Sequence, residues 1–145
     1  MVEDENNIPE AREAIQDGLT DGLERLHTIT LRELITNMSD GQDALGNPWE
    51  PLKESTIRAK GSDTPLIDNS RLLTDINAAS MMDRANRMAV IGTNLDYAEH
   101  HEFGAPEAGI PARPIFGPAG AYASQQAPDV IGDEIDTNLE GAVID

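Results

Sequence analysis

The feature that most constrains the fold is a long run of apolar residues at helical spacing in the first third of the chain. Between Pro9 and about Met38, apolar residues recur mostly every three or four positions. These residues are Ala11, Ile15, Leu19, Leu23, Leu26, Leu34 and Met38. The spacing predicts one long amphipathic helix. Asn7, Pro9 and Glu10 resemble a helix start, with the asparagine as cap, the proline in the first turn and the glutamate reaching back.

Ala14, Gly18 and Gly22 form a stripe of small residues along this predicted helix. A glycine inside a helix costs about 1 kcal/mol relative to alanine, so the stripe needs a reason. Two explanations are open at this point. The glycines are exposed and simply tolerated, or they mark a place where another helix comes close, for example from a neighbouring subunit.

The charge of the chain predicts a dependence on salt. Its 145 residues include 27 acidic and 10 basic ones, for a net charge of -17, and Lys53 and Lys60 are the only lysines. So acidic a surface repels itself in dilute buffer and becomes tolerable when a Debye length of about 3 Å at 1 M salt screens it. This balance is typical of proteins built for high salt, and we expect a salt requirement for folding or assembly.

Composition also excludes several classes of protein. The chain has no cysteine, which rules out disulfides and thiolate metal sites. No apolar run approaches the roughly 20 residues of a membrane span, and the acidic start MVEDENN has the wrong charge for a signal peptide, so we expect a soluble protein without membrane contact. Aromatic residues make up only 3%, a thin supply for a core, which favours stabilisation by association.

The remaining pattern predicts one domain over 8–145, preceded by a flexible acidic arm over 1–7. Strands over 76–82 and 87–93 are expected to form an antiparallel hairpin that turns at Asp83 to Asn86. The segment 120–145 is expected to be an exposed acidic helix or tail, begun or kinked by Pro128. The predicted fold class is therefore α+β, with the long N-terminal helix packed on a small, mostly antiparallel sheet, short connecting helices and an acidic C-terminal helix.

A turn-rich stretch holds the only tryptophan and precedes the only basic cluster. Trp49 lies between Pro48 and Pro51, and we interpret Trp49 with Leu52 as a structural anchor over one end of the core, the alternative being a ligand-stacking role. The basic residues that follow are Lys53, Arg58 and Lys60. They form either a solvated face or a contact for DNA or an acidic partner.

The segment from Tyr97 to Ala119 combines a short helix with two rigid corners. The residues from Tyr97 to Phe103 suit a helical turn, with Asp96 as its cap and Gly104 as a left-handed stop. Pro111 and Pro114 then hold the backbone between them extended. Such a segment presents a shape to another surface and shows no pattern of a reaction centre.

Known catalytic and metal motifs do not occur. The chain lacks the GxxxxGK[ST] phosphate loop, GxGxxG and the GxSxG nucleophile elbow. Glu99, His100, His101 and Glu102 are adjacent, and neighbouring residues on a helix point about 100° apart, so the four cannot converge on one ion. We predict no catalytic residues, no cofactor and no metal, with His101 as a half-buried packing residue.

Four blocks in order carry a family resemblance: GNPWEPLKESTIRAKG, PLIDNSRLLTDI, VIGTNLDYAEHHEFG and IPARPIFGPA. The set, spanning 46–119, resembles the tail-completion, or virion morphogenesis, family of tailed bacteriophages. Two departures occur. Asn69-Ser70 stand where Thr-Gly is usual, and Ile115-Phe116 replace Phe-Leu.

The resemblance implies a non-catalytic α+β subunit that forms a ring, commonly sixfold, at the head-tail junction of a virion. Its implied partners are further copies of itself, a head connector, adaptor or stopper protein, the tail tube protein, and DNA that passes through the lumen without specific binding. The protein would be found in the virion neck, and in the host cytoplasm during assembly. Together with the acidic composition, this suggests a virus of a halophilic, archaeal host.

From this resemblance we predict a subunit interface in the proline-pinned segment. The expected interface residues are Tyr97, His101, Phe103, Arg113, Pro114, Ile115 and Phe116. Arg113 would make a charge-assisted contact, and Ile115 and Phe116 would fill a neighbour's pocket. The alternative is that the segment folds back on its own subunit. Other functions left open are a tail-terminator ring, an acidic DNA mimic or antirestriction protein, and a metal-dependent hydrolase.

Overall fold

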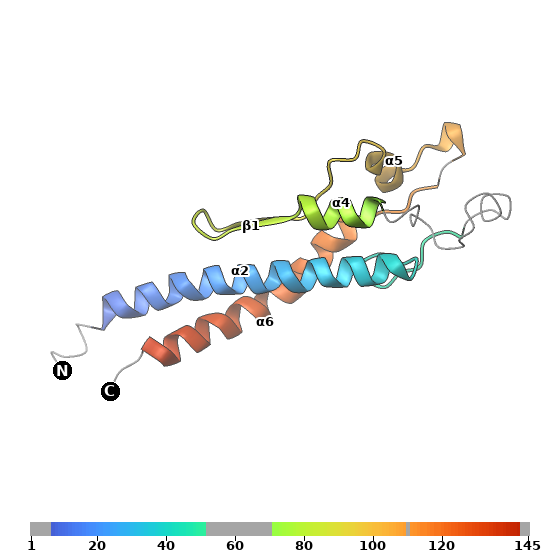
Figure 1. Cartoon of the computed structure of the whole chain (residues 1–145). Coiled ribbons are helices and arrows are strands. Elements are labelled where there is room, and N and C mark those ends of the chain that lie inside the picture. Colours follow the sequence, from blue (N-terminus) through green and yellow to red (C-terminus); the bar gives the residue numbers. More distant parts are fainter. Residues whose placement is uncertain (1–6, 52–70, 110, 143–145) are drawn as a thin grey trace.

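Two long helices lie side by side and run in opposite directions (Figure 1). The computed structural model describes residues 7–51, 71–109 and 111–142. In chain order its elements are α2 (Ile8–Ser39), α4 (Arg71–Ala79), β1 (Met81–Asp83), β2 (Met88–Val90), α5 (Ala98–Phe103), the 3₁₀ turn η1 (Pro106–Ala108) and α6 (Phe116–Ala142). Helix α4 and strand β2 also lie against α2, so α2 is the element that the others share.

The predicted N-terminal helix is confirmed. It runs from Ile8 to Ser39, one residue beyond the expected range at each end. Asn7 occupies the cap position and Pro9 lies in the first turn, but no side-chain hydrogen bond from Asn7 closes the cap. Seven buried residues of α2 follow one another at four-residue steps: Ala14, Gly18, Gly22, Leu26, Thr30, Leu34 and Met38. Four residues exceed a full helical turn by about 40°, so this buried line winds slowly around α2.

The glycine stripe marks a close helix contact, and the partner is α6 of the same chain. A Cβ atom on Gly18 would lie 2.5 Å from the Cα atom of Ile135. One on Gly22 would lie 2.8 Å from the Cα atom of Ile131. Real Cβ atoms do not approach other atoms so closely, hence only glycine allows the two backbones this separation. The second of the two explanations for the stripe is confirmed.

The acidic helix expected over 120–145 is present as α6, but one of its faces is packed on α2 and is not exposed. It starts at Phe116, continues through Pro128 without ending there, and packs on α2 along its length. An ion pair of 3.4 Å joins Arg25 to Glu134, and the Asn138 amide donates to Asp21 Oδ2 at 3.1 Å. Burying one face of α6 against the glycine stripe stabilises a helix whose opposite face stays exposed and acidic.

The expected sheet is reduced to one hairpin of two three-residue strands, with Met81 opposite Val90 and Asp83 opposite Met88. Its turn lies where predicted, after Asp83. The first predicted strand was mostly wrong, because residues 76–79 belong to α4, which buries Leu72 and Ile76 one turn apart. The fold among the described residues is therefore mostly helical, and α2 packs chiefly on α6 instead of on a sheet.

The apolar core lies at one end of the helix pair. It joins the last turns of α2 to the loop after it, to α4, to α5 and to the start of α6. Its buried members are Leu34, Met38, Ala44, Trp49, Leu72, Ile76, Ala98, Ile115 and Ala119. Beyond this core, α2 and α6 continue together as an arm held by small residues and the polar contacts described above.

Candidate functional site

The short helix α5 is tied to the start of α6 by one carboxylate. Glu102 Oε1 accepts hydrogen bonds from the backbone N–H groups of Ile115 at 2.6 Å and Phe116 at 2.8 Å, and Oε2 accepts one from Gly117 at 3.0 Å. The first N–H groups of a helix lack partners within the helix, and its N-terminus favours negative charge. Glu102 therefore caps α6 and fixes α5 beside it.

This cap was missed from the sequence. Glu102 lies 13 residues before Ile115, whereas the local capping signals that a sequence shows involve residues within one turn of the helix start. Only the tertiary path of the chain brings Glu102 to α6.

Arg113 and its neighbours face the inside of their own subunit. The Arg113 side chain is buried, and its Nε donates to the carbonyl oxygen of Glu50 at 3.0 Å. A second guanidinium nitrogen, Nη2, donates to the carbonyl oxygen of Pro51 at 3.4 Å. The backbone N–H of Arg113 donates to His101 O at 2.6 Å, which ties the segment to α5 as well.

Trp49 closes the other side of this segment. Its indole N–H donates to the carbonyl oxygen of Pro114 at 2.9 Å, and its ring is buried in the core beside Ile115, which has no exposed surface. Arg113, Pro114 and Ile115 thus make contacts within their own subunit, and their contact with a neighbour stays a prediction. Leu52, Lys53, Arg58 and Lys60 lie outside the described residues.

The remaining residues of the predicted interface are more accessible. Phe116 is half-buried against the core, and His101 is half-buried and meets Tyr97 edge-to-face, with ring centroids 5.7 Å apart. Tyr97 keeps 36% of its surface exposed. Phe103, at the last position of α5, keeps 74% exposed, the largest value among the large apolar side chains of the described residues. Gly104 follows with φ 74° and ψ 171°, so it ends α5 as a glycine but not in the left-handed helical conformation expected.

The hairpin is held on α2 by charged and polar contacts. Arg84, which lies in the turn of the hairpin, pairs with Asp21 at 2.8 Å and with Glu24 at 3.2 Å. The Arg87 Nε–H donates to Thr20 Oγ1 at 3.0 Å. His27 Nε2 lies 3.1 Å from the carbonyl oxygen of Val90 and donates to it. The hydrogen bond from Arg84 lowers the pKa of Asp21, with a further contribution from the Asn138 amide.

Asp75, on α4, accepts hydrogen bonds from the segment that follows β2. Its Oδ2 accepts from the Thr93 hydroxyl and from the Asn94 N–H at 2.7 Å. These two hydrogen bonds lower the pKa of Asp75, the Thr93 bond having the larger effect. The carboxylate thus supports the backbone between β2 and α5 in its ionised form.

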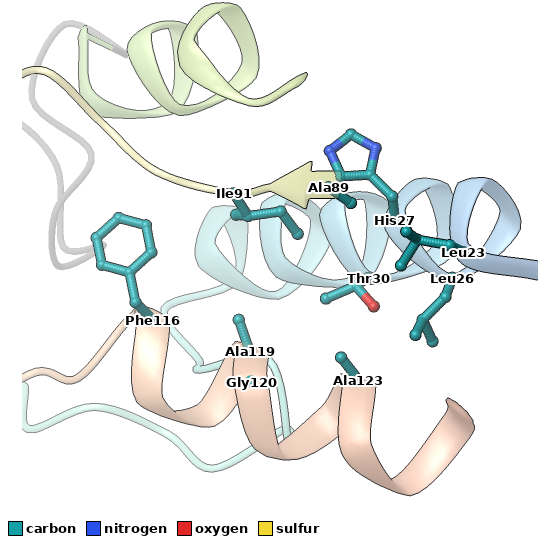
Figure 2. Close-up of a pocket in the computed structure, with 10 residues that line it drawn as sticks. All are labelled: Leu23, Leu26, His27, Thr30, Ala89, Ile91, Phe116, Ala119, Gly120 and Ala123. Atoms are coloured by element: carbon teal, nitrogen blue, oxygen red, sulfur yellow. The ribbon is translucent and has the colours of Figure 1, made fainter. Parts of the chain in front are cut away.

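A groove opens between α2, β2 and the first turns of α6, with a volume of about 270 Å³ (Figure 2). Small residues line much of it: Ala89, Ala119, Gly120 and Ala123. Larger apolar side chains form its ends and one wall: Leu23, Leu26, Ile91 and Phe116. Its polar lining comes from His27 and Thr30. The groove is therefore apolar, with short side chains leaving room on the α6 side.

Thr30 has a polar group that finds no partner among the described residues. Its hydroxyl is buried and has no hydrogen-bond partner among the described residues. Thr20 and Thr28, on the same helix, donate to the carbonyl oxygens four residues earlier, Gln16 O and Glu24 O. Thr30, which lines the groove, therefore differs from these two threonines in having a buried hydroxyl that is unpaired within the described residues. Buried polar groups are nearly always paired.

The described parts of the chain show no group of three or more histidine, cysteine, aspartate or glutamate side chains placed to hold a metal ion. Within the same residues, no helix is both long and apolar enough to cross a bilayer. The described residues offer a mostly helical scaffold, the exposed side chain of Phe103 and the apolar groove.

Comparison with protein families places the chain in one of them. The model of the phage virion morphogenesis family matches residues 11–140, and the chain belongs to that family. It is therefore a tail-associated virion morphogenesis protein, which implies a structural and not an enzymatic role. The comparisons found no match among curated proteins and none among solved structures.

Proposed function

We propose that this protein forms a homo-oligomeric ring at the head-tail junction of a tailed virus, where it joins or completes the tail. The family match over 11–140 carries the proposal. A rigid scaffold and an exposed aromatic side chain on a fixed helix support it, because buried aromatic anchors dominate subunit contacts. The partners of the ring would be a head connector, adaptor or stopper protein on one side and the tail tube on the other.

The fold-back of Arg113 changes how the proline-pinned segment serves such a ring. Arg113, Pro114 and Ile115 stabilise the subunit itself, through the carbonyl groups of Glu50 and Pro51 and the Trp49 indole. Their rigidity positions α5, which carries Tyr97 and Phe103 at the surface. We therefore assign the contact with a neighbour to α5, and the support of α5 to the proline-pinned segment.

An acidic face suits a passage for DNA. Asp129, Asp133, Asp136 and Glu140 are exposed on one face of α6, at helical spacing. If this face lines the lumen, it repels the phosphate backbone, and DNA slides past without binding. The net charge of -17 makes the same surface self-repelling, so ring assembly would require salt.

Light scattering after size exclusion tests the ring directly. The full chain would be sized in low salt and in multimolar KCl. We expect one species of several copies, six being the number that the family resemblance suggests, at high salt, and its dissociation at low salt. A monomer at every salt and protein concentration would contradict the proposal.

One observation favours a second function, an acidic DNA mimic or antirestriction protein. The exposed acidic face of α6 could present carboxylates to a basic nucleic-acid-binding protein. Such a protein would stay monomeric or dimeric and be absent from virions. Mass spectrometry of purified particles separates the two functions, because a ring subunit is a component of the particle. A tail-terminator ring would be distinguished by its position at the tail tube end.

A further inference from the structure

The most exposed large apolar side chain of the described residues sits on a short helix that is hydrogen-bonded to the start of α6. Phe103 has 74% of its surface exposed. Its neighbour Glu102 accepts three backbone hydrogen bonds from the start of α6. Ala98, five residues before Phe103 on α5, is buried in the core. A side chain on a fixed backbone loses less conformational freedom on burial by a partner than one on a mobile loop. Phe103 therefore has the properties of an interface anchor.

The groove has the size and lining for such an anchor. Its volume of about 270 Å³ lies just below the range of about 300 to 1,000 Å³ typical of drug-sized ligands. A groove of this volume suits one aromatic side chain and the end of its helix better than a cofactor. The lining is apolar, with short side chains at Ala89, Gly120 and Ala123. Thr30 adds a buried hydroxyl that its own chain leaves without a partner among the described residues.

The approach to the groove is also poor in charge. Ile15 and Leu19 of α2 are 41% and 37% exposed and lead along the helix to Leu23 at the groove. Asp17 and Asp21 lie two residues after them, about 200° around the helix. On a chain of net charge -17, this is a face where a second acidic copy can approach without facing Asp17 and Asp21.

We propose that the groove between α2, β2 and α6 receives helix α5 of a neighbouring copy, with Phe103 as the side chain that enters it. This rests on the proposed ring. The anchor and the groove belong to one chain, and Phe103 is not among the residues that line the groove of its own copy. A contact between two different surfaces of identical subunits is head-to-tail, and repeated head-to-tail contacts close into a ring when the rotation allows.

Crosslinking between singly substituted chains tests the contact, because the natural chain has no cysteine. Glu99→Cys places a thiol on exposed α5, one turn before Phe103. Gly120→Cys places one at the groove, where an added Cβ meets nothing within 4 Å. Rings would be assembled from an equal mixture of the two variants carrying tags of different mass, and treated with a short bis-maleimide.

Gly141→Cys is the matched control. It is the same substitution on the same helix, at an exposed glycine where an added Cβ also meets nothing within 4 Å, 21 residues further along α6. We expect a product that joins a Glu99→Cys chain to a Gly120→Cys chain, and at least tenfold less of it with Gly141→Cys. Each variant assembled alone measures crosslinks between like positions. An intrachain product cannot form, since each chain has one thiol.

Phe103→Ala gives an independent measurement. Truncating an interface anchor should raise the protein concentration at half-assembly about 30-fold or more, while the thermal melt of the monomer stays unchanged because the side chain is exposed. Glu107→Ala, at a nearby exposed position, should leave assembly unchanged. Rings without the Gly120 product, or with Phe103→Ala assembling normally, would overturn this docking contact and leave the ring intact. Failure of the unsubstituted chain to form rings would overturn both.

Discussion

Replacing Gly18 with alanine tests the helix contact on which the fold depends. Helix propensity alone predicts that this change stabilises α2 by about 1 kcal/mol. The structure predicts the opposite sign, because the new Cβ would lie 2.5 Å from Ile135 Cα, 2.9 Å from its Cγ1 and 3.0 Å from its backbone nitrogen. Two of these atoms are backbone, so a rotamer change in Ile135 cannot relieve the clash.

The expected magnitude follows from these two opposing effects. Overpacking a contact costs about 1 to 3 kcal/mol, and a clash with backbone belongs at the upper end. Subtracting the propensity gain of about 1 kcal/mol leaves a net destabilisation of about 2 kcal/mol. For a chain of this length that lowers Tm by roughly 4 to 8 °C. Gly22→Ala, with the Ile131 Cα atom at 2.8 Å, should behave similarly with a smaller loss.

Urea unfolding followed by circular dichroism, in multimolar KCl and at one protein concentration, measures the effect. Gly132→Ala is the control, because it lies inside α6 and an added Cβ meets nothing within 4 Å. It should raise the free energy of unfolding by up to about 1 kcal/mol. If Gly18→Ala stabilised the protein as much as Gly132→Ala, α6 would not lie against the glycine stripe, and the account of the fold would be refuted.

Three further predictions follow. Glu102→Ala should lower the free energy of unfolding by about 2 kcal/mol in urea titrations, because it removes a charged cap that accepts three N–H groups; Glu99→Ala, on the same helix but exposed, should change it little. Hydrogen bonds from Thr93 and Asn94 lower the pKa of Asp75, so its contribution to stability is complete above the unfolded pKa and is lost as pH falls through the folded pKa. Asp75→Asn should therefore flatten the decrease in the free energy of unfolding below about pH 4. An unchanged dependence on pH would contradict this. The Tm of the unsubstituted chain should rise from low to multimolar KCl, because its charge of -17 is then screened; an equal Tm in both would show that the acidic surface imposes no salt requirement.

Local patterns made part of the fold predictable. The apolar period of α2 and the turn after Asp83 are local signals, and both were found where expected. The glycine stripe left a close helix contact as one of two explanations and could not say which helix, because a backbone contact leaves no pattern on the partner. Helix α4 was partly taken for a strand although Leu72 and Ile76 are spaced one helical turn apart.

The supports of the candidate site could not be predicted. Arg113 donates to the carbonyl oxygens of Glu50 and Pro51, and backbone acceptors are the same in every sequence. The Glu102 cap joins residues that only the tertiary fold brings together. The groove likewise depends on three elements from distant parts of the chain (Figure 2). Sequence patterns singled out the segment from Tyr97 to Ala119 as a candidate, while the structure showed which of its side chains contact their own subunit and which remain at the surface.

The central claim is that several copies of this chain surround the DNA path at the head-tail junction. Reconstruction of the neck of the purified virion by cryo-electron microscopy tests it most directly. We expect density for a closed ring of this chain between the head connector and the tail tube, with each copy contacting two siblings. Absence of the chain from the neck, or a single copy that touches no sibling, would contradict the account.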